Sequence, residues 1–339
     1  MTERAGRAVS WIVSALLAAV LLYYALRGVD WPGVWRTLAG ARWNYIAAAA
    51  AIISGSFFLR GLRWRILLNA GTSGGARCGV ATVFWANMAG YLGNNFLPAR
   101  AGELVRSFLI SRHSSLSKTY ALTTALAERL ADVIALVLWS SLIVMGLRSE
   151  PGWMAGLSRS MAVVAAAGAA AIAVAPHTGG LVRTLLEHIP MPLNLRGRLL
   201  GMTEQVLLGL GAFHHWGRFF LFAIFTVAIW LADAASTMVG AASLGLHIPF
   251  PVAMLLLAGM GLGSALPSTP GYVGIYQFVA VTVLVPFGIS RDGALAYILL
   301  AQAIGYVVVL AYGLPGIYRL GGSLRGLRTQ STSEPAAIA

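Results

Sequence analysis

Stretches of apolar residues long enough to cross a lipid bilayer recur along the whole chain. A helix that crosses about 30 Å of hydrocarbon needs roughly 17 to 25 apolar residues. Inside lipid the backbone must satisfy its own hydrogen bonds, so a spanning segment is either a helix or part of a closed barrel. Full spans are predicted at residues 9–26, 43–59, 120–147, 157–175, 216–246 and 295–318. The pattern therefore predicts an all-α, polytopic integral membrane protein with about six full spans.

The charged residues are few and mostly basic. Of 339 residues, 58% are hydrophobic and 10% are charged, whereas a soluble domain has about 25% charged residues. The formal net charge of +13 lies in short segments between apolar runs, which favours anionic lipid headgroups over nucleic acid as partners. Cys78 is the single cysteine, and no Cys/His cluster has metal-ligand spacing. We expect no metal and no cofactor.

Two further apolar segments, at residues 78–110 and 251–287, are predicted to be broken helical hairpins. Both tips carry the pattern Leu-Pro-x-x-x-Gly, at residues 97–102 and 266–271, and Gly93 and Gly263 lie at matching positions upstream. If each hairpin is re-entrant, the two form an inverted repeat that dips into the membrane from opposite sides. If they are full spans, the chain has eight apolar helices. The alternative is that two Leu-Pro turns arose independently. Paired broken segments of opposite orientation point to a transporter site at the membrane midplane.

The distribution of basic residues predicts the orientation of the chain. With a cytoplasmic N-terminus, most of the 24 Lys and Arg residues fall on the cytoplasmic side, as the positive-inside rule requires. Both termini are thus expected in the cytoplasm, with the chain in the inner (cytoplasmic) cell membrane. Arg60, Arg63 and Arg65 are interpreted as an interfacial basic segment that follows the second span. Residues 1–320 are predicted to form one transmembrane domain, with an amphipathic cytoplasmic segment at 177–215 and a short disordered tail at 321–339.

Charged residues inside apolar runs are the main candidates for a site. Glu128 and Asp132 are four residues apart and share one face of a helix, while Arg129 lies about 100° away. A charge at the bilayer centre costs on the order of 2.5 to 3.5 kcal/mol, so these groups should face the bundle interior and find partners. Arg100 and Arg106 are the expected counter-charges. The alternative is a structural ion-pair network that holds the first hairpin against the fourth span.

The other candidate positions lie in the sixth span and at the hairpin tips. Asp233 is a candidate for ion coupling or for binding a headgroup ammonium, and a satisfied aspartate between helices is the alternative. Asn94 and Asn95 could bind a headgroup or cap the broken helix. Backbone amides that begin the second return arm could hold a phosphate. The residues assigned to the tips are Pro98, Gly102, Pro267, Thr269, Pro270, Gly271, Gly274 and Gln277.

Two of these segments resemble a known family. The runs GNNFLPARAGELVRSFLI and LPSTPGYVGIYQFV are similar to the transmembrane flippase domain of lysylphosphatidylglycerol synthases and their stand-alone relatives. The resemblance covers residues 9–318. Its first motif maps onto Asn94, Pro98, Arg100, Gly102, Glu103 and Arg106, and its second onto Pro270, Gly271, Gly274 and Gln277.

This chain departs from the family pattern at Tyr272, where a glycine is usual, and at Gln277, where an acid is usual. The soluble aminoacyl-transferase domain of the full synthases is missing, so the resemblance implies a chain that makes no aminoacyl lipid. What it implies instead is movement of a lipid headgroup between leaflets, with polyprenyl-linked sugars among the substrates of the wider family.

The expected function is therefore a lipid flippase or scramblase, not an enzyme, that moves a phospholipid or polyprenyl-linked headgroup through a groove between the two hairpins. Arg100 and Arg106 are expected to hold phosphate, and Glu103, Glu128 and Asp132 to balance them or bind a cationic headgroup. Two alternatives remain open. One is an ion-coupled transporter of small solutes, and the other is a non-transporting partner of a lipid-modifying enzyme. The sequence indicates neither the lipid nor the oligomeric state.

Overall fold

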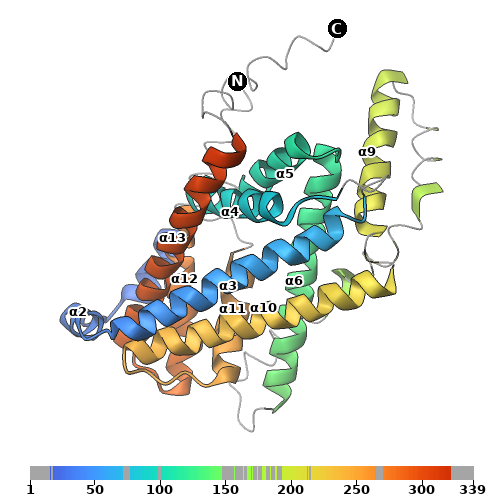
Figure 1. Ribbon diagram of the computed structural model, residues 1–339. Coiled ribbons are helices and arrows are strands. Elements are labelled where there is room, and N and C mark those ends of the chain that lie inside the picture. Colours follow the sequence, from blue (N-terminus) through green and yellow to red (C-terminus); the bar gives the residue numbers. More distant parts are fainter. Residues whose placement is uncertain are drawn as a thin grey trace.

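A computed structural model describes residues 16, 18–71, 77–97, 101–146, 193–211, 213, 215–264 and 270–321, together with scattered positions between 156 and 188 (Figure 1). Throughout these residues the secondary structure is helical, with no strand. The helices are α2 (Trp31–Ala39), α3 (Trp43–Leu68), α4 (Val80–Phe96), α5 (Gly102–His113), α6 (Lys118–Gly146), α9 (Leu193–Gly211), α10 (Trp216–Ser243), α11 (Phe250–Gly263), α12 (Ile275–Leu284) and α13 (Arg291–Gly321), with short 3-10 turns η4 (Pro270–Tyr272) and η5 (Val285–Phe287).

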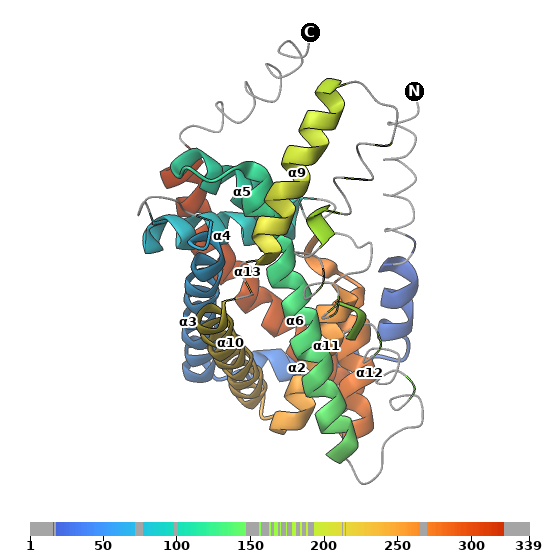
Figure 2. The same ribbon diagram turned by 90° about the vertical axis from the view of Figure 1, so that its right-hand side faces the viewer.

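Helices α3, α10 and α13 are long and apolar enough to cross a membrane. Helices α3 and α10 lie side by side along most of their length, and both are seen nearly end-on in Figure 2. The pair is antiparallel, because the Arg42 N–H before α3 donates to the Ser243 carbonyl at the end of α10 over 2.9 Å. Further along the pair, the Ser236 hydroxyl donates to the Ala49 carbonyl over 3.1 Å.

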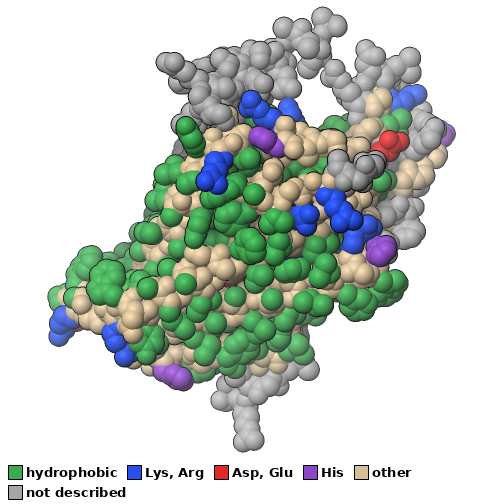
Figure 3. Space-filling view, in the orientation of Figure 1, with side chains coloured by type: hydrophobic (Ala, Val, Ile, Leu, Met, Phe, Trp, Pro, Cys, Tyr) green, Lys and Arg blue, Asp and Glu red, His purple; other side chains and the backbone are tan. Residues whose placement is uncertain are grey.

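The outer face of this helix pair suits contact with lipid. Figure 3 shows hydrophobic side chains in a broad band over this face, with Lys and Arg side chains gathered above and below the band. On α10 the large side chains of Phe220, Ile224 and Leu231 are exposed. A contiguous exposed apolar surface of this kind marks contact with a membrane or with another protein. The surface therefore agrees with the prediction of a membrane protein.

Helices α4 and α5 form the first hairpin, and glycines let its two arms touch. A Cβ atom built on Gly102 would lie 1.9 Å from the Gly90 carbonyl oxygen, and one on Gly93 would lie 2.8 Å from the Gly102 Cα. Gly90 lies against Arg106, and Gly93 lies against Gly102. Residue numbers therefore rise along α4 while they fall along the facing part of α5, so the two arms are antiparallel. Small residues at a helix contact are typical of membrane proteins, where close backbone packing replaces the hydrophobic effect.

Helices α11 and α12 form the second hairpin in the same way. Gly259 faces Val279 and Gly263 faces Ile275, with Cβ approaches of 2.7 and 2.8 Å. Helix α5 has 12 residues and α11 has 14, which gives lengths of about 18 and 21 Å at 1.5 Å per residue. Both lengths fall short of the hydrocarbon thickness of about 30 Å. The hairpins are thus present, while their re-entrant character and inverted relationship remain predictions.

The structure corrects the interpretation of the second span. Helix α3 does not give way to an interfacial segment after residue 59 but continues unbroken to Leu68. Arg60 and Arg63 are buried, with exposed fractions of 8% and 0%, so they do not form an exposed interfacial segment. The reason is tertiary, because carboxylates on other helices meet them inside the bundle.

Several predictions lie wholly or mostly outside the described residues. These are the span at 157–175, the tail at 321–339, the tip residues Pro98, Pro267 and Thr269, and Arg100, whereas the span at 9–26 is described at residues 16 and 18–26. Of the segment 177–215, the described part is mainly α9, which packs on α6 and is held there by a hydrogen bond of 2.8 Å from Ser117 to Gln205. The count of six spans and the division into one domain with a tail stay predictions.

Candidate functional site

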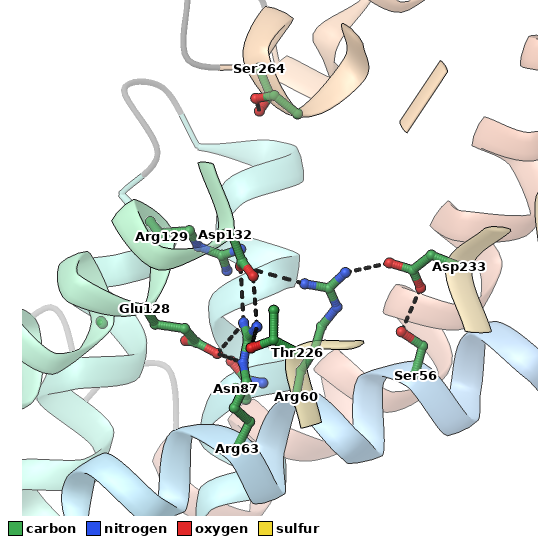
Figure 4. Close-up of polar contacts among 12 residues, drawn as sticks. Ser56, Arg60, Arg63, Asn87, Glu128, Arg129, Asp132, Thr226, Asp233 and Ser264 are labelled. Atoms are coloured by element: carbon green, nitrogen blue, oxygen red, sulfur yellow. Dashed lines mark hydrogen bonds and ion pairs between the residues drawn. The ribbon is translucent and has the colours of Figure 1, made fainter. Parts of the chain in front are cut away.

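Eight charged side chains from four helices meet in the interior (Figure 4). We call this group the ion cluster. Its members are Arg60 and Arg63 on α3, Glu103 and Arg106 on α5, Glu128, Arg129 and Asp132 on α6, and Asp233 on α10. Four guanidinium groups face four carboxylates, so the formal charges cancel. This balance allows charged groups to sit inside an apolar bundle, because an unpaired charge there is costly.

Arg63 is the centre of the cluster. Its side chain is fully buried, and each of its five N–H groups has an oxygen partner within 3.2 Å. Two of these bonds form a fork with both Asp132 oxygens, at 2.6 and 2.9 Å. The others reach Glu128 and the Thr226 hydroxyl. A guanidinium has five donors in a fixed plane, so Arg63 has none left for a ligand.

The N–H groups of the Arg106 guanidinium also have protein oxygens as partners. Its Nη1 donates to Asn87 at 2.9 Å and to Glu128 at 3.0 Å. Its Nε donates to Glu103 at 2.6 Å, its Nη2 lies 2.5 Å from the same Glu103 oxygen, and Nη2 also donates to a backbone carbonyl of α6. The guanidinium lies 4.5 Å from the centre of the buried Trp64 ring. Arg106 therefore joins α5 to α3, α4 and α6.

Arg60 and Arg129 have spare donors. Arg60 forms a short ion pair with Asp233 and lies 3.8 Å from Asp132. Arg129 donates from Nε to Glu103 over 3.1 Å and also lies 3.8 Å from Asp132. Both 3.8 Å contacts are made to the same oxygen, Asp132 Oδ2. The nearest nitrogens of the two arginines are thus separated by no more than twice that distance.

A cavity of about 370 Å³ lies beside the ion cluster and between the two hairpins. Arg60 and Arg129 line it, and their N–H groups without partners among the described residues are available to its contents. The predicted site residues that line it are Asn94, Asn95, Glu103, Arg129, Asp132, Asp233 and Gly271. Arg106 and Glu128 belong to the ion cluster but do not line the cavity.

The second hairpin closes the opposite side of the cavity. Gln277 accepts a hydrogen bond of 2.7 Å from the Gly274 N–H and donates one of 2.5 Å to Gln302 on α13. Gln302 and Tyr306 both donate to the Gly271 carbonyl, at 3.0 and 2.7 Å. The Gly274 amide is therefore engaged by a side chain and is not available to a phosphate. Gln277 fixes the start of α12 against α13 from a buried position outside the cavity lining.

An apolar groove of about 800 Å³ runs between α6 and α10. Its walls are mostly aliphatic and aromatic, with Trp139 and Leu142 from α6 and Trp216 and Phe219 from α10. Thr226 lines this groove and also accepts from Arg63. Thr226 thus connects the wall of the groove to the ion cluster.

Sequence reasoning missed Arg60 and Arg63 as members of the site. A usable signal was present, because Ile66, Leu67 and Leu68 extend the apolar pattern of the helix beyond both arginines. A second signal was the count of charges, since the acidic residues predicted inside the membrane outnumbered their expected partners. Arg100, one of those partners, lies outside the described residues.

The sequence profile of the lysylphosphatidylglycerol synthase TM region matches residues 11–313. The chain belongs to this family. Residues of the first motif of the lysylphosphatidylglycerol synthase TM family contact one another in the structure. Asn94 donates a hydrogen bond to Glu103 over 3.2 Å, and Glu103 forms an ion pair with Arg106. Gly102 of the same motif lies against Gly90. These motif residues hold the first hairpin together at the edge of the ion cluster.

A curated relative is also similar over nearly the whole chain. The glycosyltransferase AglD of Haloferax volcanii is 24% identical over 369 aligned positions, which cover 99% of this chain. The same alignment covers 58% of AglD, so the chain spans little more than half the length of that relative. Together with the family membership, this similarity supports a membrane function related to lipids.

Proposed function

We propose that the protein is a flippase or scramblase that moves the phosphorylated headgroup of a lipid between the two leaflets of the cell membrane. The observation that carries the proposal is the cavity between the hairpins, where Arg60 and Arg129 offer guanidinium N–H groups that no described residue uses. The proposal includes a phospholipid or a polyprenyl-linked lipid as the substrate and no catalytic reaction.

The arrangement suits a phosphate in transit. The two arginines share Asp132 at 3.8 Å on each side, which is too long for a strong hydrogen bond. A phosphate that enters between them can accept from both without breaking the shorter bonds that hold Arg63 and Arg106. Guanidinium groups bind phosphate well because their donors lie in a planar fork. We therefore assign phosphate binding to Arg60 and Arg129, in place of Arg106.

The rest of the fold supports the same proposal. The proposal places the short hairpin arms at membrane depth, which is tolerated only where they are buried or line a wet cavity. A headgroup inside the cavity avoids the hydrocarbon, while its chains can stay in lipid. We further propose that both termini face the cytoplasm and that anionic headgroups surround the basic segments there.

Leaflet exchange in proteoliposomes tests the proposal. Fluorescent phospholipids and a fluorescent polyprenyl phosphate are incorporated, and exchange is followed by quenching from outside. The unmodified protein is compared with Arg60→Gln, with Arg129→Gln, and with Arg36→Gln, whose side chain is 79% exposed and remote from the cavity. We expect exchange with the unmodified protein and with Arg36→Gln, and a loss of about tenfold or more in the two cavity variants, because one charge-assisted phosphate contact contributes about 1.5 to 3 kcal/mol.

Folding is checked for each variant by gel filtration and thermal denaturation. If the unmodified protein exchanges none of these lipids, the proposal fails. If exchange occurs and the folded Arg60→Gln and Arg129→Gln proteins retain it fully, the cavity is not the path.

A further inference from the structure

The two sides of the cavity differ in chemistry. The side formed by α3, α5, α6 and α10 carries the charged residues of the ion cluster. The residues that η4, α12 and α13 contribute to the lining include no charged side chain. They include instead the polar and aromatic side chains Tyr272, Tyr276, Tyr297, Gln302 and Tyr306. We call this side the neutral wall.

An aromatic pair is the main feature of the neutral wall. The rings of Tyr272 and Tyr276 are stacked, with centroids 4.9 Å apart and planes 13° from parallel. Tyr272 has a φ of +59°, and no other described residue except glycine has a positive φ. A bulky residue in this conformation costs energy and persists only where the surroundings fix it. The second hairpin thus holds an aromatic ring at the cavity in a position where glycine would be the easier residue.

Polar atoms across the cavity lack partners in the described part of the chain. Trp230 Nε1 has no hydrogen-bond partner there although the residue is only 6% exposed. The Tyr91 hydroxyl and Asn94 Oδ1 are in the same situation, and all three residues line the cavity. Uncharged polar side chains therefore contribute to both sides of the cavity lining.

We propose that the headgroup carried by this protein is a sugar joined to phosphate, with the phosphate between Arg60 and Arg129 and the sugar against the neutral wall. This inference rests on the proposed lipid-exchange function and names its substrate class. A sugar ring presents an apolar C–H face, which packs on an aromatic ring, and hydroxyls that both donate and accept. Tyrosine, tryptophan and amide side chains offer the matching surfaces. The cavity volume of about 370 Å³ lies within the usual range for a site that binds a small molecule.

The charges disfavour a cationic headgroup. A quaternary ammonium is also bound by aromatic side chains, but an ammonium is stabilised further by a free carboxylate. Each of the four carboxylates in the ion cluster is already paired with at least one arginine. At position 277 the chain has a neutral glutamine that is bonded to Gln302. The cavity therefore offers an ammonium no unpaired negative charge among the described residues.

Binding to the purified full chain in detergent tests the inference. The probes are a ten-carbon isoprenyl phosphate, the same compound with one hexose on the phosphate, and a short-chain phosphatidylcholine. We expect the hexosyl probe to bind about tenfold more tightly than the bare phosphate, because the sugar adds an aromatic contact and hydrogen bonds that the bare phosphate lacks. Phosphatidylcholine is expected to bind more weakly than the hexosyl probe.

Variants separate the two parts of the site. Tyr276→Leu keeps an apolar side chain but removes the flat ring and the hydroxyl, so the preference for the hexosyl probe should disappear while binding of the bare phosphate remains. Arg129→Gln should weaken both phosphate probes. Tyr318→Ala is the matched control, because Tyr318 is 83% exposed and outside the cavity lining.

The outcomes distinguish this inference from the proposed function. Equal binding of the hexosyl and bare phosphates, or tighter binding of phosphatidylcholine, overturns the sugar assignment even if phospholipid exchange occurs in proteoliposomes. A hexosyl preference that Tyr276→Leu retains in a folded protein overturns the neutral wall as its origin. Absence of exchange for every lipid refutes the proposed function instead.

Discussion

Arg60 and Arg63 lie one helical turn apart on α3 and have different roles in the ion cluster. Arg63 is completely enclosed and uses all of its donors on protein oxygens. Arg60 faces the cavity and keeps donors free of protein partners in the described chain. A guanidinium with all donors engaged stabilises the bundle, whereas one with spare donors can bind an anion. The number of engaged hydrogen-bond donors, more than the residue type, therefore distinguishes a structural arginine from one that is able to bind an anion.

We expect Arg63→Gln to destabilise the protein by about 3 to 5 kcal/mol, because Glu128 and Asp132 lose the charge that faces both of them in a buried position. The measurement is thermal and denaturant unfolding of the purified protein in detergent. Arg65→Gln is the matched control on the same helix, since Arg65 is half-buried and among the described residues donates to the Cys78 carbonyl, outside the ion cluster. Equal stability of the Arg63 and Arg65 variants would contradict the central place of Arg63.

We expect Gln277→Glu to lower stability by about 1 to 3 kcal/mol, although an acid is usual at this position of the family pattern. A carboxylate can still accept from the Gly274 N–H, but it cannot donate to Gln302, and no described cation is paired with it there. Gln205→Glu is the control, because Gln205 accepts a hydrogen bond from Ser117 near the surface and a carboxylate can accept the same bond. If the Gln277→Glu variant unfolds at the same denaturant concentration as the unmodified protein, the bond between the two glutamines is dispensable.

The two hairpins are built from the same device, which is close contact of glycines with the facing arm. In the first hairpin Gly102 meets the backbone of Gly90, and in the second Gly263 meets the Ile275 side chain. A backbone atom cannot move aside as a side chain can. The first hairpin therefore tolerates less added side-chain volume at its contact glycine than the second hairpin does. The contact between the Gly102 and Gly90 backbones fixes the distance between α4 and α5. This distance places Glu103 and Arg106 in the ion cluster.

We expect Gly102→Ala to destabilise the protein by about 1 to 3 kcal/mol, because the new methyl group must push α5 away from α4. Gly55→Ala is the control. Gly55 lies inside α3 with nothing within 4 Å of its Cβ position, and an alanine inside a helix gains about 0.5 to 1 kcal/mol over glycine. Unfolding in detergent measures both variants. The close-contact explanation fails if Gly102→Ala is as stable as Gly55→Ala.

The membrane orientation of the whole chain follows from charge and can be tested with cysteines. Cys78 is the only cysteine, it is 5% exposed, and burial raises the pKa of its thiol, so its reaction with maleimide at neutral pH should be slow. The unmodified protein therefore gives a low background. We expect Arg36→Cys to react with an impermeant maleimide from outside the cell, and Arg112→Cys to react only after permeabilisation. The reverse pattern would invert the proposed topology.

Local properties of the sequence were sufficient to predict the class of fold. Long apolar runs predicted an all-helical membrane protein, and Leu-Pro-x-x-x-Gly with upstream glycines predicted two hairpins, because hydropathy and the backbone limits of proline and glycine act over a few neighbouring residues. The same reasoning located Glu128, Asp132 and Asp233 as charges inside apolar helices. The sequence could also predict that such charges need partners, since the cost of an unpaired charge in lipid does not depend on the fold.

Only the tertiary structure decided which partners these charges have. Arg63 pairs with a carboxylate 65 residues away and Arg60 with one 173 residues away, and both arginines had been interpreted as interfacial. Which charges meet depends on how distant helices pack side by side, and a one-dimensional pattern contains no such distances. The same packing brings the neutral wall opposite Arg60 and Arg129. The sequence thus determined that this protein has charges inside its apolar helices, and the packing of those helices determined which of the charges keep hydrogen-bond donors without a partner among the described residues.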